Sequence, residues 1–450
     1  MVDFTKLANG LAGRVVTPQD NDFDALRTVM YGGVDGRPLA LVRVENAADT
    51  ARAVSFARDN KLPLAIRSGG HSANGYSTVD GGIVIDLREL KSIDLDESGR
   101  TVWAGSGLTA AELSAATTAK NLVVGFGDAG SVGLGGITTG GGVGYLTRKH
   151  GLTIDSLLAA EIVTADGRIV TTDAQTEPDL FWAVRGGGGN FGVVTRFEFA
   201  LQPLHEFTGG MMALPATPET VVAFMDAALA APEALGGIAN IMPAPPMPFL
   251  PADVHGKPII LAMLAFAGAP ADADKALAPF RALKPLADMV KPGPYMSMYP
   301  PEDPNYHPTA VSKTMFMDRV TSDDATTMLG FLTESDAPVR VVQLRPLGGA
   351  AARIPNDATA YAHRDAPIMV NVASFYVGEE DKPRRAKWVA DLAQALYQGR
   401  DGGYVNFVND EGPEAVRSAY PEATYKRLQS IKKRYDPANL FRLNQNVVPA

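Results

Sequence analysis

The sequence predicts an α+β protein in two parts. Residues 36–204 alternate short apolar strands with helices and carry three glycine-rich stretches. From His205 on, prolines become frequent and strand-like runs alternate with alanine-rich helices, which is typical of an antiparallel sheet covered by helices on one face. We therefore divide the chain into residues 1–204, with a core of about 36–204, residues 205–419, and a C-terminal segment, 420–450, that returns to the first part.

In the first part, an extended apolar run at 39–44 precedes a helix at 47–60, in which Ala51, Val54 and Ala57 recur at helical spacing. Further strands are expected at 64–66, 83–87 and 102–104, followed by a helix at 109–120. Segments 159–164 and 168–172 flank an Asp-Gly hairpin turn. A strand at 193–201 ends this part.

The second part is expected to contain strands at 259–266, 339–347 and 369–375 and helices at 218–231 and 387–397. The stretch 402–410 also has the pattern of a strand, with Tyr404, Asn406 and Val408 on one face. A last helix at 425–433 ends at Asp436-Pro437, since proline cannot continue a helix.

Composition limits the classes of function. The 450 residues are 46% hydrophobic and 20% charged, which suits a large folded core. The net charge of −9 argues against a nucleic-acid partner, and no apolar stretch approaches the roughly 20 residues of a membrane span. There is no cysteine for a disulfide or a thiolate site, and the N-terminus has no secretion pattern, so we expect a cytoplasmic protein without a membrane partner.

The loop between the strands at 64–66 and 83–87 contains five glycines and one histidine, His71. Paired glycines permit positive φ and let backbone N–H groups approach the oxygens of a pyrophosphate. Arg67 and Ser68 would add a cation and a hydroxyl at the mouth of this cradle. The alternative is a glycine-rich hairpin with a solvent-facing histidine.

A second stretch, 125–145, has ten glycines in twenty-one residues, too many for an ordinary strand or helix interior. A backbone with so few side chains indicates close approach of a large flat ligand. A third cluster, Gly186 to Gly189, either lines the same ligand or forms a flexible turn.

Three sequences, RSGGHS, VGLGGITTGGGVGYLTRKHGLTIDSL and the ending YKRLQSIKKRYDPANLFRLNQNV, together resemble the covalent-flavin oxidases of the vanillyl-alcohol oxidase superfamily, specifically the berberine-bridge-enzyme-like branch. The resemblance implies a two-part, PCMH-type FAD-binding domain, a substrate domain and FAD as cofactor. It also implies that the third glycine cluster lines the adenine and pyrophosphate side of the flavin.

The resemblance puts His71 at the position of the family's covalent histidine. Ala129 stands where many members carry a cysteine that makes a second flavin link, so a single tether is expected, as in the 6-hydroxynicotine oxidase subgroup. Val132 falls at a position associated with access of oxygen to the flavin, which favours an oxidase.

The complete set of FAD-binding residues that this resemblance implies is His71, Arg67, Ser68, Gly69, Gly70, Ser72, Gly130, Ser131, Val132, Gly135, Gly136, Thr138, Gly140, Gly141, Gly142, Gly144, Tyr145, Val194, Tyr404, Asn406 and Asn444.

Candidate catalytic residues are Gln343, Arg345 and Tyr404. Gln343 and Arg345 share a face of the strand at 339–347, where family members often carry an acid; neither is a base near pH 7, but Arg345 could hold a carboxylate or oxyanion. Tyr404, if its pKa were lowered by a nearby cation, could accept a substrate proton. It could equally be a core tyrosine.

The substrate is not specified by the sequence. An aromatic and thioether set in the second part suits a flat molecule but could equally be core: Tyr295, Met298, Tyr299, Tyr306, Met315 and Phe316. His150, His363 and Arg364 are interpreted as structural, and the other histidines lack metal-ligand spacing, so no metal is expected.

Two functions from different classes remain. The first is an oxidase that takes a hydride from a small alcohol- or amine-bearing molecule onto covalent FAD and reduces oxygen to hydrogen peroxide. The second is a flavin-binding sequestration or resistance protein without efficient turnover, because the expected acid is missing. A nicotinamide-dependent flavin reductase ranks third, since no second dinucleotide motif follows.

Overall fold

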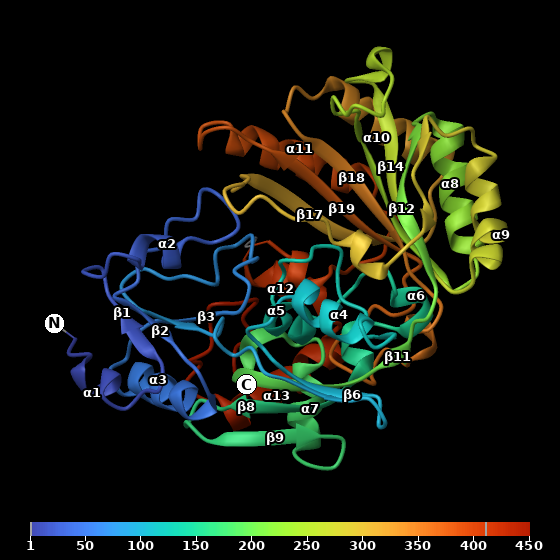
Figure 1. Cartoon of the computed structure of the whole chain (residues 1–450). Helices are drawn as coiled ribbons and strands as arrows, with labels where there is room; N and C mark the ends of the chain where they lie inside the picture. The colour runs from blue at the N-terminus through green and yellow to red at the C-terminus, as the bar shows by residue number, and fades with distance from the viewer. Residues whose placement is uncertain (1, 410–411) are drawn as a thin grey trace.

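The computed structural model describes residues 2–409 and 412–450, and it has the α+β architecture that the sequence predicts (Figure 1). Two small sheets and a two-stranded pair form one half of the molecule, and a large antiparallel sheet forms the other. Within the described residues no helix is both long and apolar enough to span a bilayer.

The first sheet has the order β1-β2-β4-β3. Strands β2, β4 and β3 are parallel, and β1 is antiparallel to β2. The 64–87 stretch is therefore a crossover between parallel neighbours, and the alternative interpretation as a hairpin is wrong. The elements are α1 (Thr5–Ala8), β1 (Arg14–Val16), α2 (Phe23–Arg27), β2 (Ala40–Arg43), α3 (Ala47–Asp59), β3 (Leu64–Arg67) and β4 (Ile83–Asp86).

The second sheet is antiparallel, with the order β5-β6-β10-β8-β9. Gly167 makes the β8–β9 turn with φ +86°, as the Asp-Gly signal predicts. Its strands are β5 (Ile93–Asp96), β6 (Thr101–Gly105), β8 (Leu157–Val163), β9 (Ile169–Asp173) and β10 (Val193–Ala200), and β7 (Leu122–Val123) pairs with β11 (Gln202–Pro203) nearby.

Short helices accompany this sheet. A capping box between Thr109 and Glu112 starts the first of them, α4, because each side chain accepts a bond from the other residue's backbone N–H. The short helices of this half are α4 (Ala110–Thr118), α5 (Leu134–Gly140), α6 (Thr147–His150), η1 (Thr153–Ser156), α7 (Pro178–Val184) and η2 (Gly188–Asn190).

Helix α5 was not expected, because it contains Gly135, Gly136 and Gly140. Glycine disfavours a helix by up to about 1 kcal/mol per residue, but here two of the three glycines allow close packing. A Cβ on Gly135 would lie 2.9 Å from Ser68 Cβ, and one on Gly140 would lie 2.0 Å from Asn406 Oδ1.

The large sheet is antiparallel, with the order β15-β12-β14-β13-β18-β19-β17 and β16 beside β12. Its strands are β12 (Phe207–Pro215), β13 (Leu235–Pro243), β14 (Pro258–Ala267), β15 (Ala287–Asp288), β16 (Lys291–Pro292), β17 (Ala310–Met317), β18 (Arg340–Pro346) and β19 (Ile368–Phe375). Short 3₁₀ turns join them: η3 (Ala252–Val254), η4 (Tyr295–Met298) and η5 (Ala351–Arg353).

Four helices cover the outer face of this sheet (Figure 1): α8 (Pro218–Ala230), α9 (Pro270–Arg281), α10 (Ser322–Glu334) and α11 (Lys382–Ala395). Alternate residues of the strands, such as Val342 and Leu344, are buried in that core. The residues between them, such as Gln343 and Arg345, therefore point toward the first part of the molecule, as period-two alternation predicts.

The strand expected at 402–410 is not formed. Tyr404 lies in extended backbone before the single 3₁₀ turn η6 (Val405–Phe407), and Asp410 lies outside the described residues. The alternation of Tyr404, Asn406 and Val408 was misleading, because Tyr404 and Val408 are buried by packing on different neighbours, in two separate core clusters.

The last helices are α12 (Pro413–Ala419) and α13 (Glu422–Tyr435), and α13 ends directly before Asp436-Pro437, where the sequence predicts a stop. The C-terminus then lies within the half formed by the two small sheets (Figure 1). A buried ion pair orders this return: Lys432 Nζ lies 2.7 Å from Asp436 Oδ2 and also donates to the carbonyls of Asn190 and Phe441.

Candidate active site

A cavity of about 500 Å³ lies between the two halves, and segments of both halves contribute to its wall. Parts of the β3–β4 loop and of the segments 127–139, 189–194 and 441–445 line it from the first half. The large sheet contributes Ser312, Gln343, Arg345 and Asn371, and the η6 loop contributes Tyr404 and residues 406–409.

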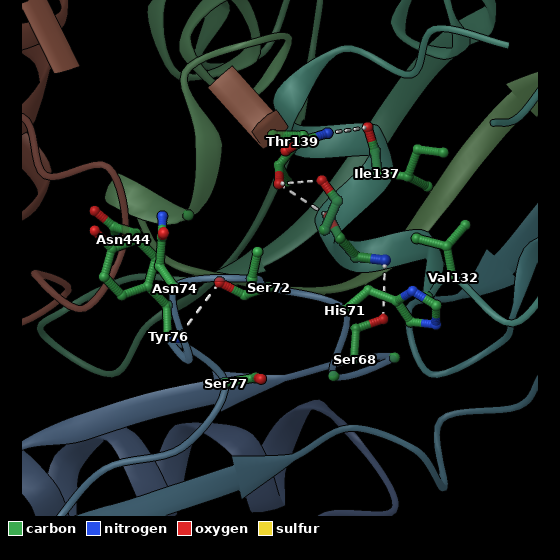
Figure 2. A pocket seen from close by; sticks show the side chains of 18 of the residues that line it. Ser68, His71, Ser72, Asn74, Tyr76, Ser77, Val132, Ile137, Thr139 and Asn444 are labelled. Carbon is green, nitrogen blue, oxygen red and sulfur yellow. Dashed lines mark hydrogen bonds between the residues drawn. The ribbon is translucent and has the colours of Figure 1, made fainter. Parts of the chain in front are cut away.

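The first two glycine stretches meet at this cavity. Ser68 Oγ donates to the Ser106 carbonyl (2.6 Å) and accepts from Gly135 N (3.1 Å), the bond that Figure 2 draws. Gly69 and Gly133 approach so closely that a Cβ on Gly69 would lie 2.3 Å from Gly133 N. Larger residues would force these two segments apart, so the glycines are needed to form the wall.

His71 lies in the cavity wall, and Figure 2 shows it and Val132 toward one end of the view, with Asn444 toward the other. Its Nε2 is 2.9 Å from Ser131 Oγ. Burial lowers the pKa of His71, and this effect exceeds the opposing influence of Glu302. The imidazole is therefore neutral near pH 7 and has a free nitrogen lone pair.

Arg345 sits at the centre of a polar network on the large sheet. Its Nη2 lies 2.8 Å from Asp128 Oδ2, and its Nε donates to Gln343 Oε1 at 2.9 Å. Gln343 in turn donates to Asn240 Oδ1 at 2.9 Å. The guanidinium is almost fully buried, whereas the Asp128 side chain is 31% exposed toward the cavity. Arg345 Nη1 is buried without a partner among the described residues.

Tyr404 does not have the environment that a base requires. Its hydroxyl oxygen accepts from Gly142 N and Asn406 Nδ2, each at 2.9 Å. Burial nevertheless raises the pKa of Tyr404, because desolvation outweighs these donors and the cation at Arg345. The lowered pKa expected from the sequence is thus wrong, and the hydroxyl serves to tie the η6 loop to the glycine-rich segment.

The structure places several other predicted flavin-binding residues in the cavity wall: Ser68, Gly69, Gly70, Ser72, Val132, Gly135, Gly136, Val194, Asn406 and Asn444. Gly136 faces open space, and Ala129, the position of the missing cysteine, also lines the cavity.

Arg67 lies elsewhere. It is only 1% exposed, and its guanidinium points into the protein, where Nε donates to the Ser77 carbonyl (3.0 Å) and Nη2 to the Arg27 carbonyl (2.8 Å). Burial lowers the pKa of Arg67 to about 10. It therefore fixes the start of the loop and supplies no cation at the mouth.

The remaining predicted residues support the wall from behind. Their glycines pack against backbone or side chains: a Cβ on Gly142 would lie 2.0 Å from Thr153 Oγ1, and one on Gly144 would lie 1.6 Å from the Phe126 carbonyl oxygen. The residues outside the cavity lining are Gly130, Ser131, Thr138, Gly140, Gly141, Gly142, Gly144 and Tyr145.

The aromatic and thioether set from the second part is mostly core. Tyr295, Met298 and Tyr299 are buried together beside Tyr145. Met315 and Phe316 are buried elsewhere, whereas Tyr306 is exposed. His363 and Arg364 are structural, as predicted: His363 Nε2 lies 2.9 Å from the Ala419 carbonyl oxygen, and Arg364 forms a buried ion pair with Asp155.

Sequence reasoning missed two carboxylates in the cavity wall, Asp128 and Glu302. Asp128 stands inside the glycine-rich stretch GFGDAG, and an acidic residue in such a stretch could have been noticed. Glu302 lies in a proline-rich loop with no local signal.

The fold and this cavity define a class, the FAD-linked oxidoreductases. Residues 38–173 match the family model described as "FAD binding domain", and residues 403–448 match the model described as "Berberine and berberine like". A FAD-linked oxidoreductase of Bacillus subtilis is 31% identical over 98% of this chain and 97% of its own length. The chain belongs to the berberine-bridge-enzyme-like family of FAD-linked oxidoreductases.

Other relatives support this family assignment. The (R)-6-hydroxynicotine oxidase of Paenarthrobacter nicotinovorans is 30% identical over 99% of both chains. The solved structure of 6-hydroxy-D-nicotine oxidase from Arthrobacter nicotinovorans superposes with a TM-score of 0.87 at 28% identity over the whole of both chains. A berberine bridge enzyme variant, at 22% identity and a TM-score of 0.88 over 99% of both chains, shares the fold.

The residues present fit a bound FAD. Asn444 Oδ1, Ser77 Oγ and Asn371 Oδ1 belong to lining residues and are buried without a partner among the described residues. Buried polar atoms normally have a partner, so these atoms point to a polar ligand. Gly69, Gly70, Gly135 and Gly136 supply a wall without side chains against which a flat ring system can lie.

Proposed function

We propose that this protein is an oxidase that takes a hydride from a small alcohol- or amine-bearing molecule onto FAD bound covalently through His71, and that oxygen then reoxidises the flavin to give hydrogen peroxide. The observation that carries the proposal is the position of the His71 imidazole in the wall of a glycine-lined cavity. Among the described residues its Nε2 is hydrogen-bonded and its Nδ1 is not.

FAD, when bound, supplies the hydride acceptor. The β3–β4 loop, α5, Val194 and Asn444 would hold it, and Val132 lines the same cavity, which supports access of oxygen. Because Ala129 replaces the second cysteine, the tether would be single.

Asp128 is the residue that best fits the role of base. Its carboxylate contacts the cavity and is held at 2.8 Å by Arg345, which fixes its direction. In our proposal an Asp128 oxygen accepts the proton from the substrate hydroxyl or ammonium group as hydride leaves, and Gln343 orients Arg345.

The alternative, a sequestration protein without turnover, was favoured by the absence of an acid on the strand of the large sheet. Asp128 removes that premise, because the acid reaches the cavity from the glycine-rich stretch instead.

The test is acid precipitation of the purified yellow protein, followed by mass measurement of the pellet and a screen of secondary alcohols and amines for peroxide release. We expect one FAD on a peptide containing His71, and free FAD from His71→Ala. A wild-type pellet without flavin would contradict the covalent bond, and a flavin-loaded protein without peroxide on any substrate would favour sequestration.

A further inference from the structure

Three residues from separate segments form a continuous hydrogen-bonded line that ends at His71. Ser131 Oγ lies 2.9 Å from His71 Nε2 and 2.5 Å from Glu302 Oε2. The backbone N–H of Ser131 also points to Glu302, with Oε1 at 3.3 Å. His71 comes from the β3–β4 loop, Ser131 from the second glycine stretch and Glu302 from the loop after η4.

The donors and acceptors of this line fix the direction of its protons. An ionised carboxylate only accepts, so both Ser131 donors, N–H and O–H, point to Glu302. A hydroxyl has a single proton, and the Ser131 oxygen must therefore accept from His71 Nε2–H. The imidazole is held as the Nε2–H tautomer, and the lone pair remains on Nδ1.

The two ends of the line differ in exposure. The imidazole of His71 is largely buried, which disfavours its charged form, whereas Glu302 is at the surface. Among residues 2–409 and 412–450, the carboxylates that act on the charge of the ring are Glu302 and Asp128. A proton that moves from the ring through Ser131 to Glu302 can thus leave to water.

We propose that Ser131 and Glu302 are positioning residues for the attachment of flavin to His71: they hold Nδ1 as the nucleophile and carry away the Nε2 proton. This inference rests on the proposed covalent link. In the net reaction a C–H bond of the flavin 8-methyl group and the imidazole N–H bond break, a C–N bond forms, and dioxygen takes up the two electrons and two protons as hydrogen peroxide.

Glu302 also makes attachment depend on the second part of the chain. The loop that carries it begins after η4 with Tyr299, whose hydroxyl donates to the Gly127 carbonyl at 3.0 Å. Glu302 reaches Ser131 only when this loop is docked on the glycine-rich stretch. Attachment therefore follows assembly of the complete cavity.

The experiment is a time course of covalent incorporation when full-length apoprotein is mixed with FAD in air. Wild type is compared with Glu302→Gln, Ser131→Ala, Glu302→Asp and the matched control Asp303→Asn, an acid of the same loop. Covalent flavin is measured by fluorescence of the acid-denatured protein, and non-covalent FAD affinity is measured before attachment proceeds.

At FAD concentrations that saturate each variant, we expect Glu302→Gln and Ser131→Ala to attach FAD at least roughly tenfold more slowly than wild type. Glu302→Asp should recover part of the rate, and Asp303→Asn should behave as wild type. Circular dichroism of each variant shows whether it is folded, and the exposure of Glu302 makes Glu302→Gln tolerable.

Two outcomes would overturn the inference in distinguishable ways. Equal attachment rates in wild type and Glu302→Gln would overturn the role of this line and leave the covalent oxidase intact. A wild-type protein that never retains flavin after acid would overturn the covalent link and the positioning role together.

Discussion

Arg345 Nη2 and Asp128 Oδ2, which are 217 residues apart in the chain, lie 2.8 Å from each other in the cavity wall. One belongs to β18 of the large sheet and the other to the glycine-rich stretch of the first half. The pair joins the two halves at the candidate active site, and it brings to the cavity a carboxylate that β18 itself lacks.

Asp128→Asn removes the charge but keeps the size of the side chain. If Asp128 accepts the substrate proton, anaerobic flavin reduction should slow by about 100-fold or more, because a positioned base contributes roughly 10²–10⁴-fold. Stopped-flow absorbance with the best substrate from the peroxide screen measures this rate. Asp94→Asn, at an exposed position of β5, is the control. A reduction rate within threefold of wild type would exclude Asp128 as the base.

Tyr404→Phe should affect stability more than chemistry. The change leaves the N–H of Gly142 and the amide of Asn406 without their buried acceptor, which costs on the order of 1–3 kcal/mol. We expect a lower free energy of unfolding in urea and a reduction rate within about threefold of wild type. A tenfold slower reduction with unchanged stability would restore Tyr404 as the base.

Lys432→Met should destabilise the C-terminal return strongly. Both members of the Lys432–Asp436 pair are fully buried, and loss of one partner from such a pair costs about 3–5 kcal/mol. Urea denaturation measures the loss, and Lys433→Met, one residue on and exposed, should change the free energy of unfolding by less than about 0.5 kcal/mol. Equal effects of the two substitutions would show that the buried pair has no special role.

His150 should make stability depend on pH. Burial, helped by the charge of Lys149, lowers the pKa of His150 in the folded protein to about 4, below the ordinary value of 6.5. Between these values the unfolded chain binds a proton that the folded chain does not, so the stability present above pH 6.5 is lost as pH falls toward 4. The free energy of unfolding should fall less steeply in His150→Gln than in wild type over this range, as urea titrations at several pH values would show. Parallel slopes would contradict this prediction, and His205→Gln at the surface serves as the control.

The elements with strong local patterns were predicted well. The helix at 47–60 appears as α3, the Asp-Gly turn joins β8 and β9, and the alternation of β18 directs Val342 to the core and Gln343 to the cavity. The stretch 402–410 failed because its alternation is short and its burial comes from neighbours distant in sequence. Helix α5 was missed because glycine content argues against a helix, whereas tertiary packing required the glycines there.

The sequence by itself determined the family, the glycine-lined wall and the placement of His71 in it, because these depend on continuous motifs whose residues act near one another in the chain. Only the tertiary structure decided that Arg67 turns inward, that burial keeps the pKa of Tyr404 high, and that Asp128 and Glu302 reach the cavity. Their roles depend on partners in other segments of the chain or on removal from water, and neither is encoded in local spacing.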